Sequence, residues 1–129
     1  MSKARLQKPT ASELELLRIL WTRGPSTVRD VHEALSEEKS LGYTSVLKLL
    51  QIMTTKGLVR RNEEQRAHVY EASHSAAEMK QQLAGDVLRR VFGGSASELM
   101  MHALEGRQTS KQELDELRRL LDKYEEKAR

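Results

Sequence analysis

The stretch YTSVLKLLQIMTTKG, residues 43–57, decides the fold. A helix turns by about 100° per residue, which gathers its apolar side chains into one narrow stripe. These side chains are Val46, Leu49, Leu50 and Met53. The opposite face is polar and has no acidic residue, because it carries Thr44, Lys48, Gln51 and Thr55. Gly57 can adopt the left-handed backbone conformation that often ends a helix. The stretch therefore predicts an amphipathic helix from Tyr43 or Thr44 to Lys56.

Two further helices are predicted upstream of this one. Residues 11–23 have helical apolar spacing, and Gly24-Pro25 ends the run. Ser26 or Thr27 is expected to cap a second helix that runs to about Glu37. A polar loop then leads to the third helix.

Downstream of Gly57 the period changes from helix to strand. Residues 58–62 and 67–71 are predicted to be two short strands, and residues 63–66 join them as a hairpin tip. Three helices followed by a hairpin is the element order of a winged helix-turn-helix domain. We therefore expect such a domain over residues 1–73.

The second half of the chain is predicted to be helical throughout. Helices are expected over residues 76–92, 96–105 and 111–128, with a break at Gly93-Gly94. Capping boxes of the form Ser/Thr-x-x-Glu precede four of the predicted helices; they begin at Thr10, Ser75, Ser95 and Ser110. The expected fold class is mainly α with a small β-hairpin wing. A helical region over residues 74–129 follows the winged domain.

This helical region is predicted to be a dimerisation domain. A segment of this length buries too little apolar surface to be stable alone, so we expect a homodimer with a shared core. The alternative is that residues 75–128 pack back on their own N-terminal domain. The residues expected to build the dimer are Leu99, Leu104, Leu114, Leu117, Leu121 and Tyr124.

Composition excludes several classes of protein. The 129 residues include no cysteine, which removes disulfides, iron–sulfur clusters, thiolate catalysis and cysteine-based metal sites. There is no apolar run of about 20 residues and no apolar signal region, so a cytoplasmic protein without membrane insertion is expected. The net charge is +3, and residues 1–72 hold all of it, with 12 Lys/Arg against 9 Asp/Glu. A basic first half suits a polyanionic partner.

Double-stranded DNA is the predicted partner, because a helix with a polar outer face fits the major groove. The residues expected to read the groove are Thr44, Ser45, Lys48, Gln51 and Thr55. Arg66, with Arg60 or Arg61, is expected to hold phosphates or a minor groove, although Glu63 and Glu64 in the same hairpin oppose this. One alternative is a plain solvated helix face. Another is a winged-helix protein-interaction module, which would show an apolar or acidic outer face instead of the polar face that carries Lys48 and Gln51.

Neither a metal site nor an active site is predicted. The four histidines, His32, His68, His74 and His102, show no ligand spacing, so no metal and no cofactor are expected. The chain has no glycine-rich phosphate loop and no nucleophile elbow or triad context, and we therefore expect that it is not an enzyme.

As an ordered set, the motifs resemble the penicillinase-repressor and methicillin-resistance-repressor family of bacterial winged-helix regulators. The matching stretches are residues 10–17, Leu20-Trp21, 27–31, 42–53, 56–59, 66–70, 91–95 and 113–117. The resemblance implies a homodimeric repressor that binds a palindromic operator through its third helix and dimerises through its C-terminal region.

The resemblance also implies a switch. In the antibiotic-resistance members, a membrane-bound sensor metallopeptidase responds to a β-lactam, and the repressor is then cut at an Asn-Phe bond in the dimerisation region. The matching positions here are His102-Ala103, so the chain departs from that pattern on both sides of the bond. The copper-responsive members have a cysteine-rich C-terminus, and this chain lacks cysteine. A cut at 102–103 would detach the last helix and its leucines.

Overall fold

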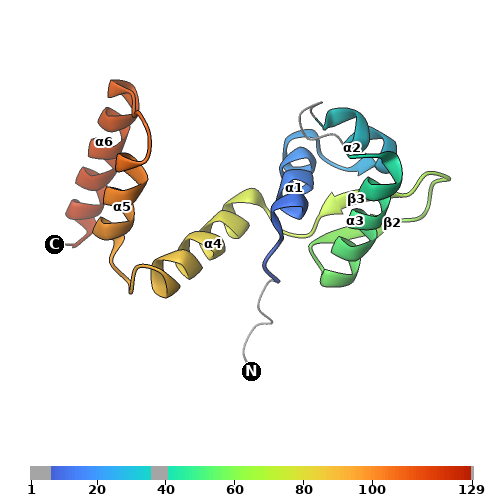
Figure 1. Ribbon diagram of the computed structural model, residues 1–129, viewed down its shortest axis with the longest axis horizontal. Coiled ribbons are helices and arrows are strands. Elements are labelled where there is room, and N and C mark those ends of the chain that lie inside the picture. Colours follow the sequence, from blue (N-terminus) through green and yellow to red (C-terminus); the bar gives the residue numbers. More distant parts are fainter. Residues whose placement is uncertain (1–6, 36–40, 129) are drawn as a thin grey trace. The chain divides into compact units, whose positions relative to one another are not determined.

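The computed structural model describes residues 7–35 and 41–128, and these form six helices and three strands in two compact units (Figure 1). The first unit spans Met1–Leu83 and the second spans Ala84–Arg129. The elements, in chain order, are α1 Ala11–Arg23, β1 Ser26–Thr27, α2 Val28–Ala34, α3 Tyr43–Lys56, β2 Val59–Asn62, β3 Val69–Ala72, α4 Ala76–Arg90, α5 Ala96–Glu105 and α6 Lys111–Ala128. The predicted fold class, mainly helical with a small sheet, is confirmed.

The first unit has one apolar core to which helices and strands both contribute. Helix α3 supplies Val46, Leu50 and Met53, all fully buried. Their spacing of four and three residues is the predicted stripe, and Leu49 packs partly against the same cluster. The other buried apolar residues are Leu16, Leu17, Leu20, Val28, Val31, Leu58, Val59, Tyr70 and Met79. The inner face of α3 is therefore fixed, and its outer face is left to solvent.

Helix α3 ends where the sequence predicts. Gly57 adopts the left-handed conformation, with φ of 81°. The Gly57 N–H donates to the Thr54 carbonyl at 3.1 Å, and the Leu58 N–H donates to the Met53 carbonyl at 2.9 Å. This pair of bonds satisfies the last carbonyls of the helix and turns the chain directly into β2. Leu58 therefore belongs to the helix cap, and the strand starts at Val59, one residue later than predicted.

The sheet has a third strand that the sequence analysis missed. Its order is β1-β3-β2, and both pairings are antiparallel. Ser26 pairs with Tyr70 and Thr27 pairs with Val69. Two residues are too few to show an alternating pattern, so only tertiary pairing identifies β1. The other side of β3 follows the predicted hairpin, with Val59 opposite Ala72.

Helix α2 is shorter than predicted. It ends at Ala34, and Leu35 has an extended backbone with ψ of 137°. Leu35 packs against the core, and leaving the helix allows it to do so. The predicted last residue, Glu37, lies outside the described residues.

The two units divide within α4. The expected boundary was near Ser73, ten residues before the division of the structure after Leu83. Met79 is buried in the core of the first unit, and Leu83 packs against that core. The Trp21 indole N–H also donates to the His74 carbonyl at 2.9 Å. The start of α4 therefore belongs with the winged domain.

The second unit contains the last two predicted helices. Gly93 and Gly94, with φ of 57° and 88°, separate α4 from α5, and α5 and α6 have the predicted bounds. Arg107 pairs with both carboxylate oxygens of Glu113 across the turn between them. None of the described residues 84–128 is buried. This unit on its own therefore has no closed core.

No helix in the described part of the chain is long and apolar enough to cross a membrane.

A buried ion pair ties the first turn of α1 to the last turn of α3. Glu13 is 2% exposed, and its two carboxylate oxygens accept from the Lys56 ammonium at 2.8 and 2.9 Å. The same carboxylate accepts from the Thr10 N–H at 2.9 Å, and the Thr10 hydroxyl accepts from the Glu13 N–H at 3.2 Å. Burial alone would raise the pKa of Glu13, but these hydrogen bonds and the Lys56 charge outweigh it and hold the pKa below its ordinary value.

The ion pair predicts a pH-dependent loss of stability in a Glu13→Gln variant. A hydrogen-bonded, buried charge contributes about 1.5–3 kcal/mol, so we expect a loss of that size at pH 7 in urea unfolding followed by Trp21 fluorescence. The folded pKa lies below the unfolded value, so this contribution is present above the ordinary pKa of 4.5 and is lost as pH falls through the folded pKa. The gap between wild type and variant should therefore close in acid.

The matched control is Glu33→Gln. Glu33 pairs with Arg29 at 3.2 Å, but both side chains are well exposed. We expect a change below about 0.5 kcal/mol there, because exposed pairs contribute little. Equal effects of the two substitutions at pH 7 would contradict the role assigned to Glu13.

Candidate DNA-binding interface

The outer face of α3 presents the predicted reading residues to solvent. Thr44, Ser45, Lys48, Gln51 and Thr55 are all exposed. The Thr55 hydroxyl donates to the Gln51 carbonyl at 3.2 Å, and it keeps its lone pairs available as acceptors. The first turn of α3 carries no acidic residue. Since the N-terminus of a helix favours negative charge, this end of α3 suits an anionic backbone.

Two of the three predicted wing arginines are engaged within the hairpin. Arg60 pairs with Glu71 of β3 at 3.3 Å. Arg61 pairs with Glu63, and hydrogen bonding to Tyr70, together with that neighbouring charge, raises the pKa of Arg61. These acids neutralise much of the positive charge that Arg60 and Arg61 would offer to a phosphate. The geometry thus favours Arg66 among the three.

Arg66 lines a hollow where the wing, α2 and α3 meet. The hollow has a volume of about 380 Å³, and its polar lining includes Arg29, Tyr43, Arg66 and His68. None of its described lining residues is acidic. The structure therefore places a concave surface without acidic lining residues beside the start of α3. Arg29 pairs with Glu33, which lies outside this lining, whereas no ion pair of Arg66 is found among the described residues. The sequence analysis named only Arg66, because no local pattern connects it with Arg29 or Tyr43.

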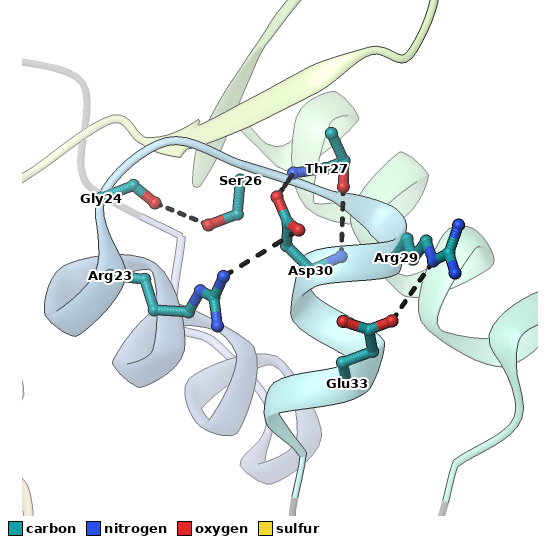
Figure 2. A network of polar contacts seen from close by, with 7 residues as sticks. All are labelled: Arg23, Gly24, Ser26, Thr27, Arg29, Asp30 and Glu33. Atoms are coloured by element: carbon teal, nitrogen blue, oxygen red, sulfur yellow. Dashed lines mark hydrogen bonds and ion pairs between the residues drawn. The ribbon is translucent and has the colours of Figure 1, made fainter.

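A polar network sets the start of α2 and so the position of Arg29 (Figure 2). The Thr27 hydroxyl accepts from the Asp30 N–H and the Asp30 carboxylate accepts from the Thr27 N–H, both at 3.1 Å. These bonds lower the pKa of Asp30, and Arg23 of α1 lies 3.9 Å from its carboxylate. Thr27 is thus the N-cap of α2, for which the sequence had offered Ser26 or Thr27. Thr27 and Asp30 form a capping box in which aspartate takes the place of the usual glutamate. This pattern is visible in the sequence, but it was not among the predicted capping boxes.

Tyr43 joins α3 to α2. Its ring meets the His32 ring edge to face, with 6.0 Å between the centroids. The tyrosine side chain remains half exposed. Tyr43 thus lines the hollow and also connects the first turn of α3 to α2 through its contact with His32.

The histidines do not gather into a metal site. His32 contacts Tyr43, His68 lines the hollow, and His102 lies 5.9 Å from the Phe92 ring. His74 lies 3.9 Å from Glu78. Among the residues that the structure describes, there is no group of three or more acidic or histidine side chains that could hold an ion.

A second surface lies in the C-terminal unit, between α5 and α6. A groove of about 550 Å³ runs there with a mainly apolar lining. Four of the six predicted dimerisation residues line it, namely Leu104, Leu114, Leu117 and Leu121. Leu99 is half-buried outside that lining, and Tyr124 is exposed. His102 and Ala103 are both exposed on α5.

Comparison with known proteins identifies the family. The family described as penicillinase repressor matches residues 9–123. The chain is 36% identical over 124 residues to a protein named transcriptional regulator BlaI from Mycobacterium tuberculosis, covering 95% of this chain and 88% of that protein. It is 22% identical over 113 residues to the penicillinase repressor of Bacillus licheniformis, covering 88% of each.

Solved structures support the fold. The solution structure of the monomeric form of Bacillus licheniformis BlaI, in complex with the blaP half-operator, matches with a TM-score of 0.50 at 19% identity. That match covers 57% of this chain and 90% of the other. A MarR family protein from Bacillus stearothermophilus matches 95% of this chain and 76% of its own, with a TM-score of 0.53 at 16% identity.

The named relatives are regulators and repressors, in agreement with the expectation that the chain is not an enzyme. From the match over residues 9–123 and the close relative over nearly the whole chain, the protein belongs to the penicillinase-repressor family of winged-helix transcriptional regulators.

Proposed function

We propose that the chain is a sequence-specific transcriptional repressor that binds double-stranded operator DNA in the bacterial cytoplasm. The observation that carries this proposal is the polar, acid-free outer face of α3, which lies beside the hollow lined by Arg29 and Arg66. An α-helix of this kind fits the major groove, and arginines beside it meet phosphates. The structure of the Bacillus licheniformis BlaI with its half-operator supports the same use of a related fold.

The residues divide by role. Lys48 and Gln51 have the donors that recognise guanine and adenine edges, and Thr44, Ser45 and Thr55 add short polar contacts. Arg66 binds backbone phosphate from the wing. Arg60 and Arg61 contribute less, because Glu71 and Glu63 are their partners. Base contacts then determine which operator sequence is recognised, and phosphate contacts determine the register of the protein on the duplex.

The repressor acts as a homodimer on a palindromic operator. The second unit exposes an apolar groove and has no buried residue among those described between 84 and 128. Leu121 is 65% exposed and Tyr124 is 57% exposed, which is unfavourable for apolar side chains in water. A second copy of the same unit would cover this surface. Two linked reading helices would then bind two half-sites with greatly increased avidity.

Proteolysis in α5 is the proposed means of release. His102 and Ala103 are exposed on the helix that precedes α6. A cut between them by a membrane-bound sensor metallopeptidase would separate α6, with Leu114, Leu117 and Leu121, from the rest of the chain. Loss of these leucines would open the dimer and weaken operator binding.

The first test is fluorescence anisotropy of the purified protein on the DNA upstream of its own gene. We expect salt-dependent binding that prefers this DNA over a scrambled duplex of equal length by about 10³ or more. Equal, weak binding to both duplexes at two salt concentrations would contradict sequence-specific recognition. It would favour a winged-helix protein-interaction module instead.

The Lys48→Ala variant tests the reading face. If Lys48 contacts phosphate as well as base edges, its loss should weaken binding and reduce the salt slope by about one. Lys80→Ala is the matched control, because Lys80 is an exposed lysine on α4, outside α3 and the wing. An unchanged slope in Lys48→Ala would exclude the phosphate contact.

The Leu117→Asp variant tests the dimer. A charge in the groove of α5 and α6 should weaken self-association about 100-fold, since burial of a leucine contributes about 1.5–3 kcal/mol. Sedimentation should then show a monomer at concentrations where wild type is a dimer, and operator binding should fall. Gln112→Asp, at an exposed position of the same helix, should leave the dimer intact. A stable Leu117→Asp dimer would refute the assignment of this groove.

A further inference from the structure

An isoleucine interrupts the polar outer face of α3. Ile52 is 39% exposed, whereas the inward residues Val46, Leu50 and Met53 of the same helix are fully buried. At about 100° per residue, Ile52 lies 40° around the helix from Lys48 and one turn after it. It therefore belongs to the face that carries Lys48 and Thr55. The sequence analysis passed over it because it sits within an apolar-looking run.

This position needs an explanation in terms of what the face contacts. Leu47 and Leu49 flank the inner stripe and pack against the core, whereas Ile52 is not among the apolar residues that pack against it. In the major groove nearly every base edge presents a hydrogen-bond donor or acceptor. An isoleucine would strip water from such a group and offer no partner in return. The one apolar group in the groove is the C5 methyl of thymine.

We propose that Ile52 is a specificity-determining residue that recognises a thymine of the operator through its C5 methyl group. This inference rests on the proposed function, because it assigns a base to one position of the reading face. Cytosine at the same place would present its amino donor to an apolar side chain and leave it unpaired. Ile52 would thus favour thymine both by methyl contact and by rejection of cytosine.

Deoxyuridine isolates the methyl contact, because it keeps the O4 acceptor of thymine and lacks only the methyl group. The experiment uses the full chain and the upstream DNA, with the thymines of one half-site replaced by deoxyuridine one at a time. For wild type we expect about fourfold weaker binding at one position, the effect of one buried methyl group. Ile52→Ala should bind the unmodified DNA more weakly and show no further loss at that position.

Gln51→Ala is the matched control on the same face. It should weaken binding but keep the fourfold effect of the missing methyl group, because Gln51 acts through hydrogen bonds. Ile52→Val keeps a branched apolar side chain and should retain part of the effect. Thermal unfolding of the three variants should match wild type, since the replaced side chains lie outside the core.

The outcomes distinguish a failure of this inference from a failure of the proposed repressor function. Specific binding with no loss at any deoxyuridine, or with the same losses in wild type and Ile52→Ala, overturns the role of Ile52 and leaves the repressor intact. Absence of any preference for the upstream DNA overturns both.

Discussion

The Glu13–Lys56 ion pair is the constraint on which the winged unit depends. It joins the first turn of α1 to the last turn of α3, at distances of 2.8 and 2.9 Å, inside a site where Glu13 is almost wholly buried. A buried carboxylate is tolerated only when it is paired and hydrogen-bonded, and Thr10 completes that requirement. Each end also suits its helix dipole, with the acid at an N-terminus and the lysine at a C-terminus. The outer face of α3 is held in position as a result.

The same end of α3 determines where the wing begins. Gly57 closes the helix and turns the chain into β2, and β3 returns to pair with both β2 and β1. Because Thr27 is both the last residue of β1 and the N-cap of α2, the strand pairing and the cap share one short segment. Arg66, Arg29 and Tyr43 line one hollow as a consequence. The surface proposed to meet the DNA backbone thus arises from three elements that are fixed to a common core.

The C-terminal unit follows a different principle. Its helices have good caps and ordered ends, yet none of the described residues 84–128 is buried. The apolar side chains line a groove instead of a core. Local signals thus predict α5 and α6, whereas the described residues 84–128 enclose no apolar core of their own. If two copies associate through this groove, as proposed above, DNA affinity depends on that association, and a change in the second unit acts on DNA binding through it.

Helices with strong apolar periodicity and clear capping residues could be predicted from the amino-acid sequence. Bounds for α1, α5 and α6 followed from their capping residues and apolar spacing, and the polar face of α3 followed from the opposite stripe. These features depend on interactions within a few residues, which a sequence displays directly. Only the tertiary structure decided the rest. Several features depend on residues far apart in the chain or on packing against the core. They are strand β1, the early end of α2 at Ala34, the pairing of Arg60 with Glu71, and the shared hollow lined by Arg29 and Arg66. No local pattern encodes such contacts, because the partner that decides each of them becomes a neighbour only when the chain has folded.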